Sequence, residues 1–296
     1  MPVLEYILLK RGDSMGKYLF FDIDGTLAGK SRCITQETRR ALAEARERGH
    51  RIFVCTGRSP ASIVGDVTEI KFDGMIAGAG SFVILNGQYV YEHYIERETL
   101  KWVLQFLTEH EVYYTIEGRD ALYRQKECGE FYFGMHRKRL AENPELARYQ
   151  QALRQGEVVK DDAEFDPDTM QAAKLCIVCH DRERFWKECA PELSKEFNVV
   201  QFSKDTETAM NGEISLKSCT KGDGIRFVLR FFGAELSDSI GFGDSMNDLP
   251  MLETAAVGVA YQDAPDGLKA HASWFFEEPD RGGIAKVMRQ MGLIGA

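Results

Sequence analysis

An apolar run ends in two aspartates in the segment Phe20-Phe21-Asp22-Ile23-Asp24-Gly25-Thr26-Leu27. Tyr18 and Leu19 extend this run toward the N-terminus, and its composition is that of a short buried strand. A polar turn follows at once, so we expect both carboxylates at the carboxyl edge of a parallel strand, where open α/β sheets bind ligands. Residues i and i+2 of a strand share a face, so the two side chains can point into one crevice. One carboxylate can then act as a nucleophile while the other transfers protons.

Strands and helices alternate along both ends of the chain. Thr35 is a suitable N-cap for a helix over 36–48, which a strand over 51–55 follows. Pro60 is expected to open a second helix, and 74–77 has the pattern of a third buried strand. The alternation resumes at Lys221 and continues to a closing helix over 283–291. This pattern predicts an α/β fold with a doubly wound, Rossmann-like parallel sheet and right-handed crossovers.

The middle of the chain follows a different pattern. Asn86-Gly87 lies between two strand-like runs and predicts a hairpin. A helix is then expected over 97–110, short strands follow, and charged helical sequence fills 127–155. We therefore expect an inserted α+β domain within a discontinuous core. The expected divisions are an extension outside the fold at 1–15, the core domain at 16–95 and 211–296, and the inserted domain at 96–210.

Three further segments end a strand or open a helix with polar residues. They are Val54-Cys55-Thr56-Gly57-Arg58, Cys219-Thr220-Lys221-Gly222-Asp223-Gly224 and Ile240-Gly241-Phe242-Gly243-Asp244-Ser245-Met246-Asn247-Asp248. Together with the first segment they resemble, in order, the four motifs of the haloacid dehalogenase (HAD) superfamily of phosphohydrolases. The insert is similar in size and placement to the α/β (C2B-type) cap of the Cof-type subfamily. The resemblance covers the chain from Met15 to its end.

The resemblance implies roles for the acidic residues. Asp22 would be the nucleophile that forms an aspartyl-phosphate and Asp24 the general acid and base, although spacing alone would allow the reverse. Two anions that approach each other favour a hard divalent cation, and oxygen ligands favour Mg²⁺. Asp244 would bind this cation with the side chain of Asp22 and the backbone carbonyl of Asp24. Asn247 and Asp248 would orient these ligands from behind.

Three other residues are candidates to bind the phosphate group: Thr56 through its hydroxyl, Gly57 through its N–H and Lys221 through its charge. Each motif residue also has a structural interpretation. The Asp-x-Asp-Gly segment can simply end a strand and turn, Thr56 can cap a helix, and Lys221 can be a solvated surface lysine. Asp248 can be a helix N-cap, and Arg58 can form a structural salt bridge instead of contacting substrate.

Substrate choice is expected to depend on the insert and on two departures from the family pattern. Gly78-Ala79-Gly80 stands where Cof-type relatives carry an asparagine, so no role passes to Ala79. Asp263 stands where an asparagine is common, and its charge would repel a phosphate. The candidate substrate contacts are Asn211, with Gly212 and Glu213 beside it, and Glu117, Arg119 and Tyr123 near the turn Glu117-Gly118-Arg119-Asp120.

Bulk composition argues against several classes of partner. The 296 residues carry a formal net charge of −9, which argues against nucleic acid or an anionic membrane as the main partner. No apolar stretch approaches the roughly 20 residues of a membrane span. The 7 cysteines form no regular framework, and the two thiols of Cys176-Ile177-Val178-Cys179 would point to opposite faces of a strand. Buried thiols in a reducing cytoplasm are therefore favoured over a zinc or redox site.

These observations favour a Mg²⁺-dependent phosphatase of small phosphorylated metabolites, such as sugar phosphates or similar monoesters. A phosphomutase of the same superfamily is an alternative, because relatives with a similar cap move phosphate between sugar hydroxyls. A non-catalytic protein that binds phosphorylated metabolites is a second alternative, against which the intact set of motif residues argues.

Overall fold

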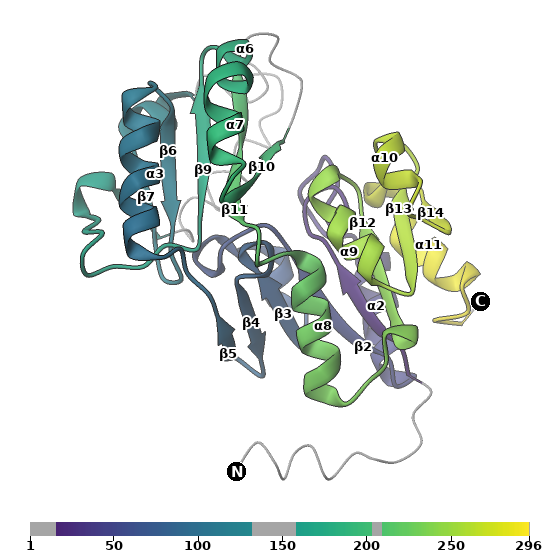
Figure 1. Ribbon diagram of the computed structural model, residues 1–296. Helices are drawn as coiled ribbons and strands as arrows, with labels where there is room; N and C mark the ends of the chain where they lie inside the picture. The colour runs from purple at the N-terminus through teal and green to yellow at the C-terminus, as the bar shows by residue number, and fades with distance from the viewer. Residues whose placement is uncertain (1–15, 132–157, 203–208, 296) are drawn as a thin grey trace.

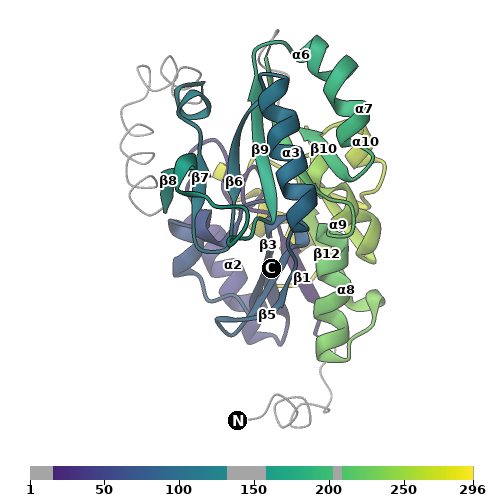
Figure 2. The ribbon, with the colours of Figure 1, turned by 60° about the vertical axis from the view of Figure 1, so that its left-hand side comes forward.

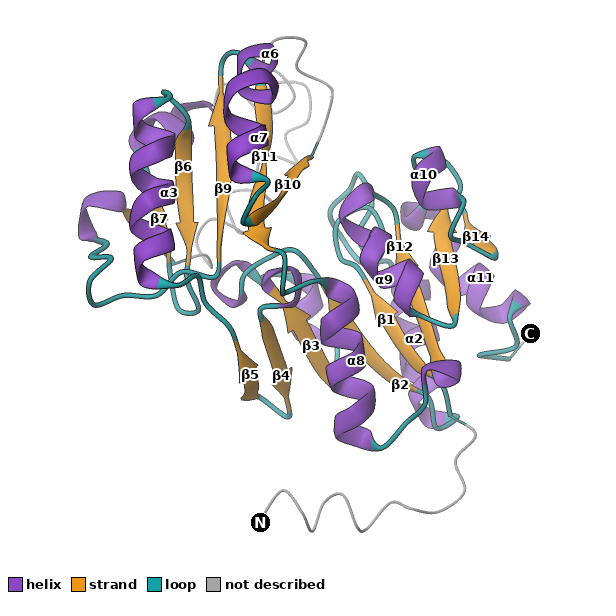
Figure 3. Cartoon of the chain, viewed as in Figure 1, coloured by secondary structure: helices purple, strands orange, loops and turns teal. Residues whose placement is uncertain are grey.

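The computed structural model describes residues 16–131, 158–202 and 209–295, whose strands form two sheets (Figures 1 and 3). We call the sheet with eight strands the large sheet and the sheet with six strands the small sheet. The expected extension at 1–15 and most of the charged segment 127–155 lie outside the described residues.

The large sheet is built from the two ends of the chain. Its strands are β1 (Tyr18–Phe21), β2 (Arg51–Cys55), β3 (Gly74–Ala77), β4 (Phe82–Leu85), β5 (Gln88–Glu92), β12 (Ser239–Gly243), β13 (Val257–Tyr261) and β14 (Trp274–Phe276). They lie in the order β14-β13-β12-β1-β2-β3-β4-β5. The first six strands of this order are parallel, and β4 and β5 form the predicted antiparallel hairpin around Asn86-Gly87.

Helices cover both faces of the large sheet because its strands are apolar on both sides. Leu19 and Phe21 pack with α2 (Gln36–Glu47) and α11 (Gly283–Gln290) on one face. Phe20, between them in sequence, faces the other layer. That second layer contains α8 (Lys221–Phe232), α9 (Leu249–Thr254) and α10 (Asp266–Lys269). The doubly wound α/β fold predicted from the alternation is confirmed.

One predicted helix is wrong. After Pro60 the chain makes two short 3-10 turns, Pro60–Ser62 and Asp66–Glu69, instead of an α-helix. Gly65 separates them with a φ of +80°, a conformation that ends a right-handed helix.

The small sheet carries helices on one face (Figure 2). Its elements are β6 (Tyr113–Glu117), β7 (Leu122–Arg124), β8 (Val159–Asp161), β9 (Lys174–Cys179), β10 (Phe197–Gln201), β11 (Met210–Leu216), α3 (Arg97–Glu109), α6 (Arg182–Arg184) and α7 (Ala190–Leu193). The strand order is β10-β11-β9-β6-β7-β8. Because β11 pairs with β9 and β10, the small sheet continues to Leu216.

This topology brings three polar strand ends together. β1, β2 and β12 are neighbours and parallel, so Asp22, Thr56 and Asp244 follow their carboxyl ends at one edge of the large sheet. None of the described helices combines the length and apolarity that crossing a bilayer requires.

Candidate active site

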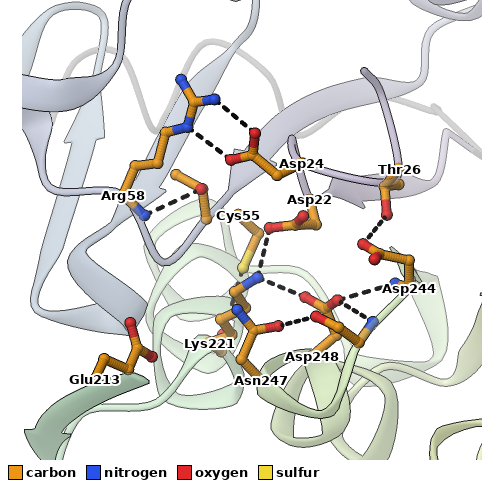
Figure 4. Close-up of polar contacts among 12 residues, drawn as sticks. Asp22, Asp24, Thr26, Cys55, Arg58, Glu213, Lys221, Asp244, Asn247 and Asp248 are labelled. Atoms are coloured by element: carbon orange, nitrogen blue, oxygen red, sulfur yellow. Dashed lines mark hydrogen bonds and ion pairs between the residues drawn. The ribbon is translucent and has the colours of Figure 1, made fainter. Parts of the chain in front are cut away.

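A buried lysine joins two aspartates at the centre of this edge (Figure 4). Lys221, the first residue of α8, donates hydrogen bonds from Nζ to Oδ1 of Asp22 at 2.6 Å and to Oδ1 of Asp248. Lys221 is 1% exposed, Asp22 4% and Asp248 0%, so solvent screens these charges poorly. Burial opposes the charge of Lys221, but the two carboxylates raise its pKa well above the usual value. Lys221 is therefore a buried cation and not a solvated surface lysine.

Asp248 fixes the loop that carries Asp244. Its Oδ2 accepts hydrogen bonds from the backbone N–H groups of Asp244 at 2.9 Å and Ser245 at 3.1 Å. The bond to Ser245 is half of a capping box at the short turn Met246–Asp248. Ser245 is the N-cap of this turn, and Asp248 is its third residue. Asp248 thus links the loop after β12 to Lys221.

Asp244 lies beside the turn that follows Asp24. Its Oδ1 accepts a hydrogen bond of 3.1 Å from the hydroxyl of Thr26. Gly25 has a φ of +90°, and a Cβ built there would lie 2.2 Å from Oδ2 of Asp244. The glycine therefore allows both the turn and the close approach of the Asp244 carboxylate.

Arg58 binds the second aspartate of the first motif. Its Nε and Nη2 donate to the two carboxylate oxygens of Asp24 at 2.7 and 2.6 Å, a bidentate pair. The Asp24 side chain is 54% exposed, unlike that of Asp22. The loss of hydration where Asp24 contacts the protein works against its ionisation, but the hydrogen bonds and the charge of Arg58 outweigh this loss and lower the pKa of Asp24. The backbone N–H of Arg58 donates to the Thr56 hydroxyl at 3.1 Å, so this hydroxyl organises the loop after β2.

The pKa values of Asp22 and Asp244 are raised, whereas that of Asp24 is lowered. Burial, with Asp248 and Asp24 nearby, outweighs Lys221 and raises the pKa of Asp22 to about 7. Burial and the charges of Asp248 and Asp22 raise the pKa of Asp244 to about 9. When Asp22, Asp244 and Asp248 are all ionised, their negative charge exceeds what Lys221 can offset.

This excess of charge fits a divalent cation. Carboxylate oxygens of Asp22, Asp244 and Asp248 lie within 4.8 Å of one another. An all-oxygen, anionic set of donors suits a hard ion such as Mg²⁺. Asp248 already accepts three hydrogen bonds, whereas Asp244 accepts one from Thr26, so Asp244 has more free ligand capacity.

The remaining candidates make their contacts outside this cluster. Asn247, which precedes Asp248, accepts a hydrogen bond of 2.7 Å from the Ser245 hydroxyl. Asn211 lies on β11 of the small sheet. Arg119 pairs with Glu92 and Asp120. Arg119 and Tyr123 line a pocket of about 470 Å³ whose wall contains none of the four motif segments.

Two contacts, one in the site and one near it, were not predicted from the sequence. Thr26 binds Asp244, and its place two residues after Asp24 in the first motif was an available signal. Lys174 lies buried between Glu117 and Glu213 on the small sheet. A lone lysine at the start of the apolar run Leu175-Cys176-Ile177-Val178-Cys179 was the signal there.

The family model for haloacid dehalogenase-like hydrolases matches residues 19–288. This chain belongs to that family. A protein of Bacillus subtilis (strain 168) named "Putative phosphatase YkrA" is 26% identical over 278 residues, covering 94% of this chain and 98% of that protein. The 5-amino-6-(5-phospho-D-ribitylamino)uracil phosphatase YwtE of Bacillus subtilis (strain 168) is 24% identical, covering 93% of this chain and 98% of that protein.

A solved structure supports membership of the same family. The structure of the HAD subclass IIB sugar phosphatase BT4131 is similar, with a TM-score of 0.74 and 26% identity, over 94% of this chain and 100% of that chain. The family predicted from the four motifs is confirmed, and the chain is a HAD-superfamily phosphatase.

Proposed function

We propose that this phosphatase requires Mg²⁺ and hydrolyses small phosphorylated metabolites, sugar phosphates or similar monoesters, through an aspartyl-phosphate on Asp22. The observation that carries this proposal is the 2.6 Å hydrogen bond from the buried Lys221 ammonium to the Asp22 carboxylate, beside Asp244. The names of two relatives, a sugar phosphatase and a phosphatase of a phosphoribitylamino compound, support the substrate class.

Asp22 would attack the phosphorus atom. A bond forms between its carboxylate oxygen and phosphorus while the bond from phosphorus to the leaving oxygen breaks. Lys221 holds one oxygen of Asp22 and favours its ionised, nucleophilic form over the protonated form that burial favours.

Asp24 would move the protons. It gives a proton to the leaving oxygen in the first step and takes one from water in the second, when water attacks the phosphorus and regenerates Asp22. The ion pair with Arg58 favours the ionised form of Asp24 and so fits its role as base. Before the first step, the approach of the substrate would have to loosen this pair so that Asp24 can carry a proton.

Phosphate would bind to the loop after β2 and to Lys221. The Thr56 hydroxyl accepts from Arg58 and keeps its own proton to donate, and the N–H of Gly57 lies next to it. Mg²⁺ would be held by the carboxylates of Asp22 and Asp244 and the backbone carbonyl of Asp24. Bound Mg²⁺ supplies positive charge that offsets the repulsion between the carboxylates and the phosphate.

The small sheet would form the cap. We place the core at 16–95 and about 217–296 and the cap between them, where it can exclude water from the site. The seven cysteines are free thiols, which fits a reducing cytoplasm.

The test is phosphate release from 4-nitrophenyl phosphate with Mg²⁺ or with chelator. The native protein should turn over only with Mg²⁺, and Asp22→Asn should lose this turnover. The matched control is Asp238→Asn, which removes a carboxylate that pairs with Lys17 at the opposite end of β12. Equal turnover in Asp22→Asn and native protein would reject Asp22 as nucleophile. With a sugar phosphate in place of 4-nitrophenyl phosphate, transfer of the phosphate to a second hydroxyl of the sugar instead of water would indicate a mutase.

A further inference from the structure

Three consecutive residues after β3 have positive φ values. We call them the glycine loop: Gly78-Ala79-Gly80, with φ values of +60°, +57° and +114°. The loop follows the carboxyl end of β3, which is parallel to β2, so it lies at the same edge of the large sheet as Thr56. A positive φ is costly for Ala79 because its Cβ crowds the backbone. Such strain persists only where the surrounding structure fixes the backbone, and it is concentrated at functional sites.

On one side the glycine loop is bonded to the loop after β2. The N–H of Ala79 donates to the carbonyl oxygen of Thr56 at 3.1 Å. The N–H of Gly78 donates to the carbonyl oxygen of Arg58 at 2.7 Å. The N–H of Thr56 in turn donates to the carbonyl oxygen of Ile76 in β3 at 2.8 Å. The segment that we propose to bind phosphate is therefore fastened to β3 and to the glycine loop.

On its other side the glycine loop contacts the first turn of α8. A Cβ built on Gly80 would lie 2.2 Å from the carbonyl oxygen of Thr220, the N-cap of this helix. The same oxygen accepts a hydrogen bond of 3.1 Å from the N–H of Gly224, so it belongs to the helical turn that carries Lys221. The absence of a side chain at Gly80 thus lets this turn lie directly against the loop.

Two further glycines bring the same turn close to its neighbours. A Cβ built on Gly222 would lie 2.5 Å from the carbonyl oxygen of Pro250 in α9. A Cβ built on Gly224 would lie 2.4 Å from Cγ2 of Ile76 in β3. The glycine loop, β3 and α9 therefore hold the start of α8 from three directions. Close packing on these sides leaves Lys221 little room to shift.

We propose that the glycine loop is a positioning element, which fixes the loop after β2 and the Lys221 turn of α8 relative to each other. This inference rests on the proposed phosphatase function and adds the residues that align its phosphate-binding groups. Thr56 and Lys221 come from separate elements, and a misplacement of about 1 Å can cost about 100-fold in rate. Because the loop acts on the reaction through Thr56 and Lys221, its members are positioning residues and not catalytic residues.

The test is Gly80→Ala, with Gly233→Ala as the matched control. Both glycines have positive φ, and Gly233 lies at the other end of α8, where an added Cβ would meet none of the described residues within 4 Å. Backbone strain should destabilise both variants, but only Gly80→Ala displaces the turn of Lys221. With 4-nitrophenyl phosphate and Mg²⁺, kcat of Gly80→Ala should fall at least about tenfold while KM changes less than about threefold, because alignment matters most in the transition state. Gly233→Ala should keep native kinetics.

The same substitution in Lys221→Met shows whether the effect passes through the lysine. In that background Gly80→Ala should lower kcat by less than about twofold, since the group that it misplaces is already absent. Ala79→Gly is the variant that decides if Gly80→Ala does not fold. Its loop is relaxed but less rigid, so its stability should rise while its kcat falls about threefold, whereas a merely structural role would leave kcat unchanged.

Equal kcat in Gly80→Ala and Gly233→Ala would overturn the proposal. A tenfold fall that persists in Lys221→Met would also overturn it, as would an unchanged kcat in Ala79→Gly. Each of these results requires a native protein that turns over with Mg²⁺, so each leaves the proposed function intact. A native protein without such turnover would overturn the proposed function and this inference together.

Discussion

Nζ of Lys221 donates a hydrogen bond of 2.6 Å to Oδ1 of Asp22, joining residues 199 positions apart in the sequence. Both side chains are buried, and the same ammonium also bonds to Asp248. A positive charge at this point decides whether the carboxylate of Asp22 is ionised, because burial alone favours its protonated form.

Lys221→Met should therefore lower kcat/KM by at least about 100-fold, a loss comparable to removal of one preorganised charge from an active site. Asp22 would lose the cation that keeps it ionised, and the phosphate would lose a positive partner. Steady-state kinetics with 4-nitrophenyl phosphate measure this loss. Lys217→Met, at an exposed position close in sequence, is the control. A Lys221→Met protein within threefold of native activity would contradict the role.

The central part of the site could be predicted because each residue follows a strand end or opens a helix. Apolar runs located β1, β2 and β12, and the parallel order then required Asp22, Thr56 and Asp244 to share one edge. The pairing of Arg58 with Asp24 could not be chosen in advance, since the direction of a long side chain depends on the loop after β2. The contacts of Lys174 with Glu117 and Glu213 could not be predicted, because they need the register of β6, β9 and β11, which distant pairings decide.

The stability of the metal-free protein should fall as pH rises. An unfolded aspartate has a pKa near 3.8, whereas folding raises that of Asp22 to about 7 and that of Asp244 to about 9. The folded state binds more protons in this window, so the free energy of unfolding decreases between about pH 4 and pH 9. Mg²⁺ competes with these protons, so the increase in Tm that Mg²⁺ gives over chelator should grow from pH 6 to pH 9. An increase that does not depend on pH would contradict this.

Asp244→Asn should separate stability from metal binding. The amide removes a charge that Asp248 and Asp22 repel, while its carbonyl oxygen can still accept from Thr26. In chelator at pH 8 we expect the variant to be more stable than the native protein by at least about 1 kcal/mol, the equivalent of less than one pKa unit. Mg²⁺ should no longer raise its Tm. Urea melts with and without Mg²⁺ measure both effects, and Asp238→Asn is the control. A variant that Mg²⁺ stabilises as much as the native protein would exclude Asp244 as a ligand.

Arg58 should affect Asp24, the proposed acid–base residue, through geometry and charge. Arg58→Lys keeps the charge but loses the two parallel hydrogen bonds to Asp24, so kcat/KM should fall about tenfold. Arg58→Ala also removes the charge, so the pKa of Asp24 should rise and the matching limb of the pH–rate profile should move to higher pH. The Lys variant should shift the same limb less than the Ala variant, because it keeps the charge and loses only the hydrogen bonds. Native activity and profile in both variants would make Arg58 a surface ion pair of no catalytic consequence.

Ala79 holds a conformation that alanine disfavours, and this allows a stabilising substitution. Its φ of +57° and ψ of +23° are left-handed, in the segment that departs from the family pattern. The left-handed region costs an L-residue about 1–2 kcal/mol, whereas glycine adopts it freely at an entropic cost of about 0.5–1 kcal/mol. Ala79→Gly should therefore stabilise the protein by about 0.5 kcal/mol or slightly more.

The matched control for this change is Ala43→Gly, at an exposed position inside α2. There the backbone is helical, so glycine should destabilise by about 1 kcal/mol. Urea unfolding of both variants in chelator measures the difference, and the two substitutions should act with opposite sign. If Ala79→Gly also lowers the midpoint, the contacts of Ala79, a residue that is 9% exposed, outweigh the backbone strain at this position.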